Sequence, residues 1–265
     1  MKGWKGKEVV DNLGYLNLNN NFPGHAPQKE RHYSRHLTFL RWLNRTFSKK
    51  VKIMDIGGGS GTLLHTIVSC ENSPIQIDKV ERYTCYDLNP YCVKNGEETF
   101  KEYNNIKFIE QDLDNHPIQE KADVVYVDST LTMFEKPYDV LYNLFNVSDY
   151  VVLNRTTIDD IPRDIKKSFK WDGMLEESVL WNFSIHKMKK FSESYGREMI
   201  LIKGLTHSKN SAHQNLSPNE YDIQTYRCET PGHFHLLQQA IDYFGGNTGI
   251  HIMLKNTKPG TDPWS

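Results

Sequence analysis

The chain has 265 residues, of which 38% are hydrophobic and 25% charged, and its formal net charge is −1 at pH 7. These values exclude a disordered chain and give no sign of a surface that coats nucleic acid. No apolar run approaches membrane-spanning length, the first residues lack the apolar core of a signal peptide, and the four cysteines form no C-x-x-C pair. We therefore expect a cytoplasmic protein that does not enter a membrane and has no disulfide framework.

Residues 1–50 are predicted to form an irregular arm followed by a helix. Residues 1–28 are polar and rich in Asn and Gly, which favours an irregular arm. From residue 29 to 47 apolar residues recur three or four positions apart, which indicates a helix packed on the domain. The alternative is that Tyr33, Arg35 or His36 of this helix reaches a ligand pocket.

A regular alternation of strands and helices occupies residues 51–155. Its strands are predicted at 51–56, 81–86, 106–110, 123–128 and 149–154, and its helices at 60–71, 90–103 and 137–146. Such an alternation is typical of parallel strands joined by crossover helices. It predicts an α/β fold with a doubly wound, mostly parallel sheet and helices on both faces.

The alternation breaks after residue 155. The elements predicted beyond it are a long polar connection at 156–182, a helix at 184–194, a strand at 197–204, a helix at 233–244 and a last strand at 249–256. Residues 205–248 then form an insertion between the two final strands. We expect one domain over residues 51–265, with 156–182 and 205–248 as lid and insertion segments.

A glycine-rich turn follows the first predicted strand. Residues 51–63 read VKIMDIGGGSGTL, which indicates a buried strand, a tight turn and a helix. Such a turn brings backbone N–H groups and a helix N-terminus close to a ligand with no side chain in between. The pattern is D-x-G-x-G-x-G, with Asp55, Gly57, Gly59 and Gly61. Because Thr62 occupies the third glycine position of the dinucleotide fingerprint, the match to NAD binding is imperfect.

Acidic residues follow the next three predicted strands. Asp87 ends the second strand, where a carboxylate can accept two hydrogen bonds from a ribose diol in either a NAD or another nucleoside site. Asp112 follows the third strand and Asp128 ends the fourth. The alternatives are that Asp87 caps the helix after Asn89, that Asp112 caps a loop, and that Asp128 is structural.

Three motifs resemble those of a known family. MDIGGGSGTL, CYDLNP and FIEQDL, in this order and spacing, are similar to the first three motifs of class I S-adenosylmethionine-dependent methyltransferases. The resemblance covers roughly residues 51–155 and extends to the last two strands. It implies S-adenosylmethionine as the cofactor and a sheet that ends in an antiparallel strand pair, which 197–204 and 249–256 could supply. The insertion at 205–248 is much longer than the short link usual in that family.

The resemblance also implies a role for each matching residue. Gly57, Gly59 and Gly61 would approach the methionine moiety and the ribose, and Asp55 would contact the amino group directly or through water. The remaining implied contacts are Asp87 with Leu88 at the ribose, Asp112 with Leu113 at the adenine, and Asp128 with Ser129 facing the sulfonium and the substrate.

Candidates for a catalytic base are Asp128, His186 and the histidines of the insertion, which are His207, His213, His233 and His235. A base would be needed to remove a proton from a hydroxyl acceptor. The stretch ETPGHFH near Cys228 matches no strong zinc signature, so we predict no metal. Asn154 and Arg155 follow the fifth strand, where substrate contacts arise in this fold; Arg155 could hold a substrate anion or form a structural ion pair.

The methyl acceptor is predicted to be a small-molecule or sugar hydroxyl. The chain lacks an Asp/Asn-Pro-Pro-Tyr-type motif after residue 128, which an amino-methylating DNA enzyme would carry, and its net charge is near neutral. One alternative is a nucleic-acid or protein methyltransferase, which a basic surface at 163–170 and 187–190 would favour. The other is an aminopropyltransferase-like enzyme or a non-catalytic nucleoside binder. An aminopropyltransferase would be expected to end its second strand in Glu and to carry an acid within its glycine turn, so Asp87 and Ser60 argue against it.

Overall fold

The computed structural model describes residues 5–8, 28–70, 73–170, 174, 176–206, 221–227 and 250–257. Its helices are α2 (Gln28–Thr46), α3 (Thr62–Ser69), α4 (Pro90–Thr99), α5 (Pro137–Val147) and α6 (Ile185–Ser194), with 3-10 turns η2 (Ile77–Lys79) and η3 (Thr130–Met133). The strands are β1 (Val51–Ile56), β2 (Val80–Asp87), β3 (Ile106–Glu110), β4 (Val124–Asp128), β5 (Tyr150–Asn154), β6 (Ile158–Asp159), β7 (Ile165–Phe169), β8 (Ser178–Ser184), β9 (Arg197–Thr206), β10 (Tyr221–Arg227) and β11 (Ile250–Asn256).

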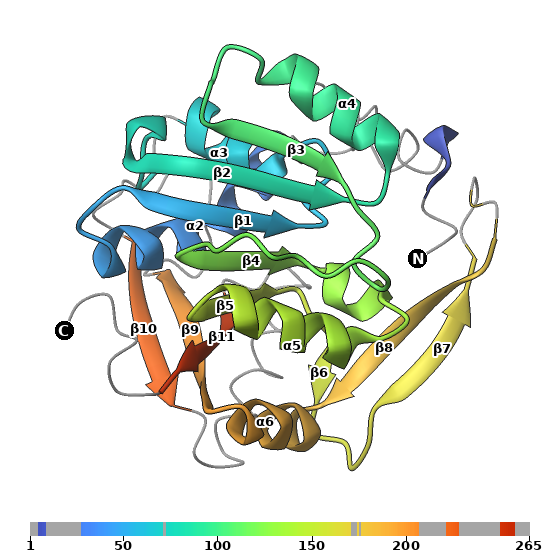
Figure 1. Cartoon of the computed structure of the whole chain (residues 1–265). Coiled ribbons are helices and arrows are strands. Elements are labelled where there is room, and N and C mark those ends of the chain that lie inside the picture. Colours follow the sequence, from blue (N-terminus) through green and yellow to red (C-terminus); the bar gives the residue numbers. More distant parts are fainter. Residues whose placement is uncertain are drawn as a thin grey trace.

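An eight-stranded sheet in the order β10-β9-β11-β5-β4-β1-β2-β3 forms the centre of the molecule (Figure 1). The five strands from β5 to β3 pair in parallel, whereas β11 pairs antiparallel with both β5 and β9. The predicted doubly wound sheet and its C-terminal antiparallel strands are therefore confirmed. Strand β10, inside the predicted insertion, is an addition that the sequence did not predict, and it extends the sheet antiparallel to β9.

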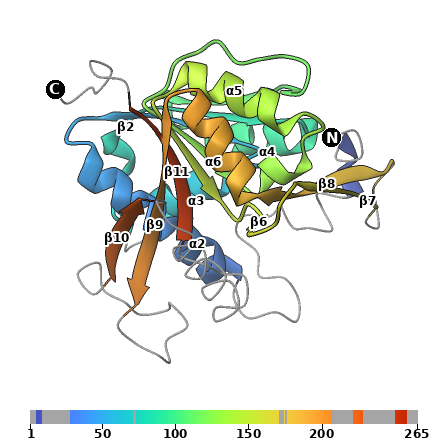
Figure 2. The same cartoon turned by 90° about the horizontal axis from the view of Figure 1, so that it is seen from below.

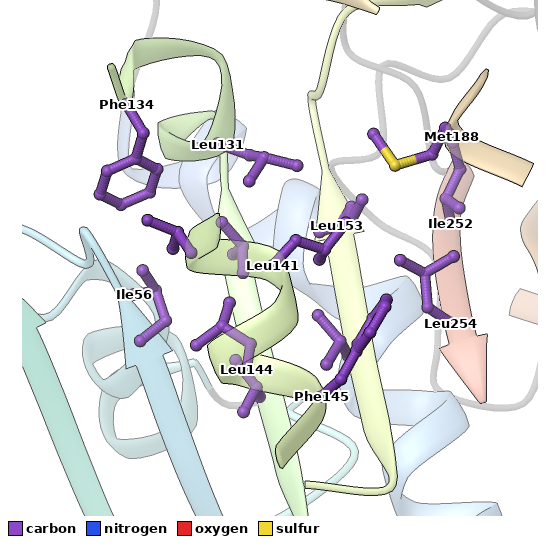
Figure 3. Close-up of a cluster of buried hydrophobic side chains, with 14 of the residues drawn as sticks. Ile56, Leu131, Phe134, Leu141, Leu144, Phe145, Leu153, Met188, Ile252 and Leu254 are labelled. Carbon is purple, nitrogen blue, oxygen red and sulfur yellow. The ribbon is translucent and has the colours of Figure 1, made fainter. Parts of the chain in front are cut away.

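Helices cover both faces of this sheet (Figure 2). On one face α5 and α6 pack in a cluster that includes Leu141, Leu144 and Met188 (Figure 3). On the other face α2, α3 and α4 pack in a second cluster that includes Phe39 and Leu64. Side chains alternate between the two faces along each strand, so both faces of the sheet have an apolar core.

Strands β4 and β5 lie in the middle of the sheet and are buried along their whole length. Their apolar residues read VVYV and YVVL, which suits strands covered on both faces. Each strand then ends in a buried polar residue, Asp128 in β4 and Asn154 in β5, and these two residues are paired in register. The polar ends of two apolar strands thus lie side by side at the carboxyl edge of the sheet.

The segment 156–182, predicted to be a long connection, instead contains most of a second, three-stranded sheet in the order β6-β8-β7. The prediction was wrong because β7 is solvent-exposed over most of its length and so has no apolar alternation. This small sheet lies beside the carboxyl ends of the central strands (Figure 1). Trp181 of β8 donates its Nε1–H to the carbonyl of Phe134 at 2.9 Å, which ties the small sheet to the end of η3.

The remaining predictions agree with the described elements or lie outside them. Helix α4 ends at Thr99, four residues earlier than expected, and the helix predicted at 233–244 lies outside the described residues. In the described part of the chain, no helix combines the length and the apolar character needed to cross a membrane.

Candidate functional site

The glycine turn after β1 is packed so closely that Gly57 and Gly58 have no room for side chains. Gly57 and Gly59 adopt positive φ angles of 66° and 60°. A Cβ on Gly57 would lie 2.1 Å from Oγ1 of Thr130, and one on Gly58 would lie 2.3 Å from Oδ2 of Asp55. The backbone of the turn is therefore fixed between η3 and the end of β1, and it borders a pocket directly.

Asp87, at the end of β2, holds the glycine turn from the other side. Its Oδ2 accepts a hydrogen bond from the Gly59 N–H at 2.9 Å, and its Oδ1 accepts one from the Asn89 N–H at 2.8 Å. Burial raises the pKa of Asp87, and the backbone N–H groups of Asn89, Gly59 and Leu88 oppose that shift. The carboxylate also lines the pocket. Each of its oxygens can accept a further hydrogen bond, which a ligand in the pocket could donate.

The pocket itself has an empty volume of about 820 Å³, including the part open to solvent. It lies at the carboxyl edge of the central sheet, the usual place for a ligand in an open α/β fold. Its walls are Gly57, Gly58, Gly59, Thr62, Tyr86, Asp87, Leu88, Asn89, Cys92, Gln111, Leu113, Asp128, Ser129, Thr130, Met133, Phe134 and Arg155. Polar groups from the strand ends and apolar groups from η3 and the loop after β3 thus face one space.

Asp128 and Arg155 form the polar part of this wall at the ends of β4 and β5. Nε of Arg155 lies 2.6 Å from Oδ1 of Asp128, and Nη2 lies 3.0 Å from Oδ2. Asn154 donates its Nδ2–H to Oδ1 of Asp128 at 3.0 Å and to the Tyr126 hydroxyl at 2.9 Å. Arg155 was predicted either to hold a substrate anion or to form a structural ion pair; the structure shows the ion pair, at the pocket wall.

The backbone at these two strand ends is unusual. Ser129 and Arg155 have φ angles of 64° and 48°, the only positive values among the described non-glycine residues. Such angles cost of order 1–3 kcal/mol and cluster at ligand sites. The Ser129 N–H donates to the Asn154 carbonyl at 2.8 Å, which couples the two strained positions across the neighbouring strands.

Asp55 lies beneath the turn and is not among the residues that line the pocket. Its Oδ2 accepts a hydrogen bond from the Tyr83 hydroxyl, and among the described residues no hydrogen-bond partner faces Oδ1. Burial raises the pKa of Asp55 to about 7; the Tyr83 hydrogen bond opposes this shift, and the charges of Asp128 and Asp87 add to it. Asp55 is therefore a buried acid that titrates near neutrality directly under Gly58.

The structure separates the other predicted residues into two groups. Leu88 and Leu113 line the pocket, whereas Gly61, Asp112 and His186 do not. Gly61 precedes α3, with its Cβ position facing Phe108, and Asp112 accepts hydrogen bonds within its own loop from the Asp114 N–H and Asn115 Nδ2. His186 is exposed on α6, with Nε2 2.6 Å from Oδ1 of Asp160.

Some candidates fall outside the described residues, namely Cys228, His207, His213, His233 and His235. In the part of the chain that the structure describes, no cluster of three His, Cys, Asp or Glu residues could hold a metal ion.

Sequence reasoning missed several residues of the pocket wall. Thr130 and Met133 come from η3, a short turn with no strong sequence signal, and Phe134 directly follows it. Gln111 precedes Asp112 and lines the pocket where Asp112 does not. The loop motif FIEQDL contains both residues, so the sequence indicated this loop, and in the structure Gln111 rather than Asp112 lines the pocket.

The chain is similar in sequence to known proteins. The family model described as a methyltransferase domain matches residues 47–198, which is more than half of the sequence. An uncharacterized protein of Methanocaldococcus jannaschii is 25% identical over 187 residues, which cover 64% of this chain and 69% of that protein.

Solved structures share the fold at low sequence identity. Magnesium protoporphyrin IX methyltransferase from Synechocystis PCC 6803, with bound SAH, matches with a TM-score of 0.54 and 13% identity over 85% of this chain and 96% of the other. A chain of the Haloferax volcanii complex that contains the Trm112 methyltransferase activator matches with a TM-score of 0.54 and 11% identity over 96% and 98%. The [4+2]-cyclase SpnF matches with a TM-score of 0.51 and 11% identity over 94% and 93%. The fold thus also occurs in a protein named for a different chemistry, so the acceptor must be argued from the site.

Proposed function

Because the chain belongs to the class I S-adenosylmethionine-dependent methyltransferases, we propose that it methylates a hydroxyl group of a small molecule or sugar. The cofactor part of this proposal rests on the position of Asp87, and the acceptor part rests on the rest of the pocket wall. The Asp87 carboxylate lines the pocket and is held there by the N–H of Gly59. A ribose diol needs an acceptor in this place, next to a backbone without side chains.

The residues present fit S-adenosylmethionine. The turn at Gly57 and Gly59 lines the pocket with backbone, and this backbone would approach the methionine moiety and the ribose. Asp87 with Leu88 would bind the ribose, and Leu113, which is 8% exposed, would contact the adenine. Asp112 would act on the adenine only if its loop rearranged, because its side chain does not line the pocket.

The sulfonium of the bound cofactor supplies an electrophilic methyl group, so the protein mainly orients the acceptor and excludes water. Asp128 lies at the junction between the cofactor part of the pocket and the part lined by Met133, Phe134 and Arg155, so it would orient both the cofactor and the acceptor. A carboxylate whose two oxygens are bound by arginine is a weak proton acceptor, so we assign Asp128 to orientation. His186 does not line the pocket and has no part in this proposal.

The pocket supports a small acceptor. Beyond the residues assigned to the cofactor, its wall combines the apolar Met133 and Phe134 with the polar Ser129 and the Asp128–Arg155 pair. Such a wall suits a compact molecule with both apolar and hydroxyl-bearing parts.

Acids compensate part of the positive charge of the basic segments 163–170 and 187–190. Lys166 pairs with Glu135 at 2.8 Å, and Lys187 pairs with Asp164 at 2.7 Å. Such pairs weaken the attraction of these two lysines for phosphates. A nucleic-acid or protein acceptor is the alternative outcome of the test below.

Two measurements test the proposal. Isothermal titration should show binding of S-adenosylmethionine and S-adenosylhomocysteine but not of NAD; heat with NAD alone would contradict the cofactor assignment. A methyl-transfer screen with labelled cofactor should then label sugars or small phenols. Label in RNA or protein, with none in the small molecules, would reject the small-molecule acceptor and leave the cofactor assignment intact.

A further inference from the structure

A buried histidine connects helix α2 to the pocket wall. His36 has an exposed fraction of 0%, and its Nε2 lies 3.6 Å from Oδ2 of Asp128. Its Nδ1 lies 2.8 Å from Oγ1 of Thr66 in α3. His36 is therefore hydrogen-bonded at Nδ1, and its Nε2, which makes no hydrogen bond to the described residues, faces at ion-pair distance an acid that lines the pocket.

The hydrogen-bonding groups around His36 indicate which of its ring nitrogens carry a hydrogen. An ionised carboxylate only accepts hydrogen bonds, so the contact is attractive when Nε2 carries a hydrogen. The Thr66 hydroxyl has one proton and lies 3.0 Å from the Thr62 carbonyl. If that proton goes to Thr62, Nδ1 of His36 must donate as well, and the ring is an imidazolium beside the Asp128 carboxylate.

The surroundings of His36 hold the ring in this position. Its ring meets Tyr126 edge-on, with centroids 5.9 Å apart, and Phe39 of the same helix stacks on Tyr126 at 4.3 Å. An apolar side chain would fill such a site at lower desolvation cost than a histidine. A polar ring here is therefore explained better by its contact with Asp128 than by packing.

We propose that His36 is a positioning residue that holds the Asp128 carboxylate at the pocket, so that helix α2 completes the functional site. Arg155 and Asn154 bind Asp128 from β5, and His36 approaches it from α2. Helix α2 ends at Thr46, before the family match begins at residue 47. The inference rests on the proposed function, because Asp128 is assigned to orienting the ligands of that pocket.

The test is a double-mutant cycle on the binding of S-adenosylhomocysteine, measured by titration. Its variants are His36→Leu, His36→Gln, Asp128→Asn and the double variant His36→Leu/Asp128→Asn. We expect His36→Leu to weaken binding about tenfold and the double variant to bind no worse than Asp128→Asn alone, because both changes disturb one interaction. His36→Gln keeps a donor for Asp128 and should retain most of the affinity.

Packing alone would give a different result. If His36 only fills space, the losses of His36→Leu and Asp128→Asn add, and Leu is tolerated at least as well as Gln. Either result overturns the inference, whereas failure of the wild-type protein to bind the ligand overturns the proposed function and the inference with it. Asn44→Ala, at an exposed residue of the same helix that contacts Lys79 at 3.3 Å, is the matched control and should leave affinity unchanged.

A second variant covers the case in which the His36 variants fail to fold. Thr66→Val removes the partner of Nδ1 and leaves His36 and Asp128 in place. It should weaken binding of S-adenosylhomocysteine two- to fivefold in the wild-type background and have no further effect in the Asp128→Asn background. Equal losses in both backgrounds would contradict the proposal.

Discussion

The guanidinium of Arg155 binds both oxygens of Asp128, with Nε 2.6 Å from Oδ1 and Nη2 3.0 Å from Oδ2, across the ends of neighbouring strands. The Asp128 side chain is only 8% exposed, so its charge depends on this partner. A bidentate pair of this kind fixes the direction of both side chains, which a single lysine contact would not do.

Arg155→Met should lower the free energy of unfolding by about 2–4 kcal/mol, because it leaves the buried Asp128 charge with weaker compensation. Asn154 and His36 still contact Asp128, which keeps the loss below that of a fully isolated charge. Urea unfolding measures the change, and Arg155→Met/Asp128→Asn should recover most of it. A double variant no more stable than Arg155→Met would show that the loss does not come from the Asp128 charge.

Lys166→Met provides the surface control for this measurement. Lys166 and Glu135 form an ion pair at 2.8 Å, but their side chains are 44% and 47% exposed. Water and salt screen such a pair, so its loss should change stability by no more than about 0.5 kcal/mol.

Asp87→Ala should weaken binding of S-adenosylhomocysteine by about 2 kcal/mol, roughly thirtyfold. The change removes the acceptor for the ribose and also the partner of the Gly59 N–H. Titration measures the affinity, and Asp112→Ala is the comparison. Asp112 does not line the pocket, so we expect its removal to change affinity less than threefold; a larger loss would place the Asp112 carboxylate on the adenine.

The central sheet could be predicted from the sequence because its strands are apolar runs between helices. The strands β1 and β3 begin and end at the predicted residues. The strand β7, by contrast, reads IKKSF and is mostly exposed, and its identity depends on pairing with β8 rather than on its own pattern. Local sequence does not contain that information.

The positions of the acidic residues at the strand ends could be predicted from the sequence, but the contacts between these residues and the rest of the site could not. Asp87 and Asp128 follow apolar strands, so their place at one edge of the sheet follows from parallel pairing. That Asp128 is bound by Arg155 and approached by His36 depends on which strands are neighbours and on how α2 packs. Those contacts join residues far apart in the chain, and no local pattern indicates them.

Gly57→Ala should abolish binding of S-adenosylhomocysteine and destabilise the fold. The φ of 66° is unfavourable for alanine by about 1 kcal/mol or more, and the new Cβ would lie 2.1 Å from the Thr130 hydroxyl. Gly196→Ala is the matched control, because Gly196 has a φ of 68° but follows α6 and does not line the pocket. It should lower stability by a similar strain energy and leave affinity unchanged; equal losses of affinity in both variants would show a general effect of destabilisation.

Asp55 should make the stability of the protein depend on pH below neutrality. Burial raises the pKa of Asp55 to about 7 in the folded state, against a value near 3.9 in the unfolded chain. Between these values the folded protein holds a proton that the unfolded chain has lost. The contribution of Asp55 to the free energy of unfolding is therefore fully present below about pH 4, falls as pH rises, and is lost above about pH 7.

The Asp55→Asn variant isolates this contribution, because asparagine does not titrate and the other acids are present in both proteins. Urea unfolding at about pH 5 and about pH 8 should show that the wild-type protein loses more stability with rising pH than the variant, by an amount of order 2 kcal/mol. We expect the Tyr83 hydroxyl to donate to the amide oxygen of the variant as it does to the Asp55 carboxylate, which would preserve the packing under Gly58. Equal changes in the two proteins would mean that Asp55 titrates outside this range and is charged at neutral pH.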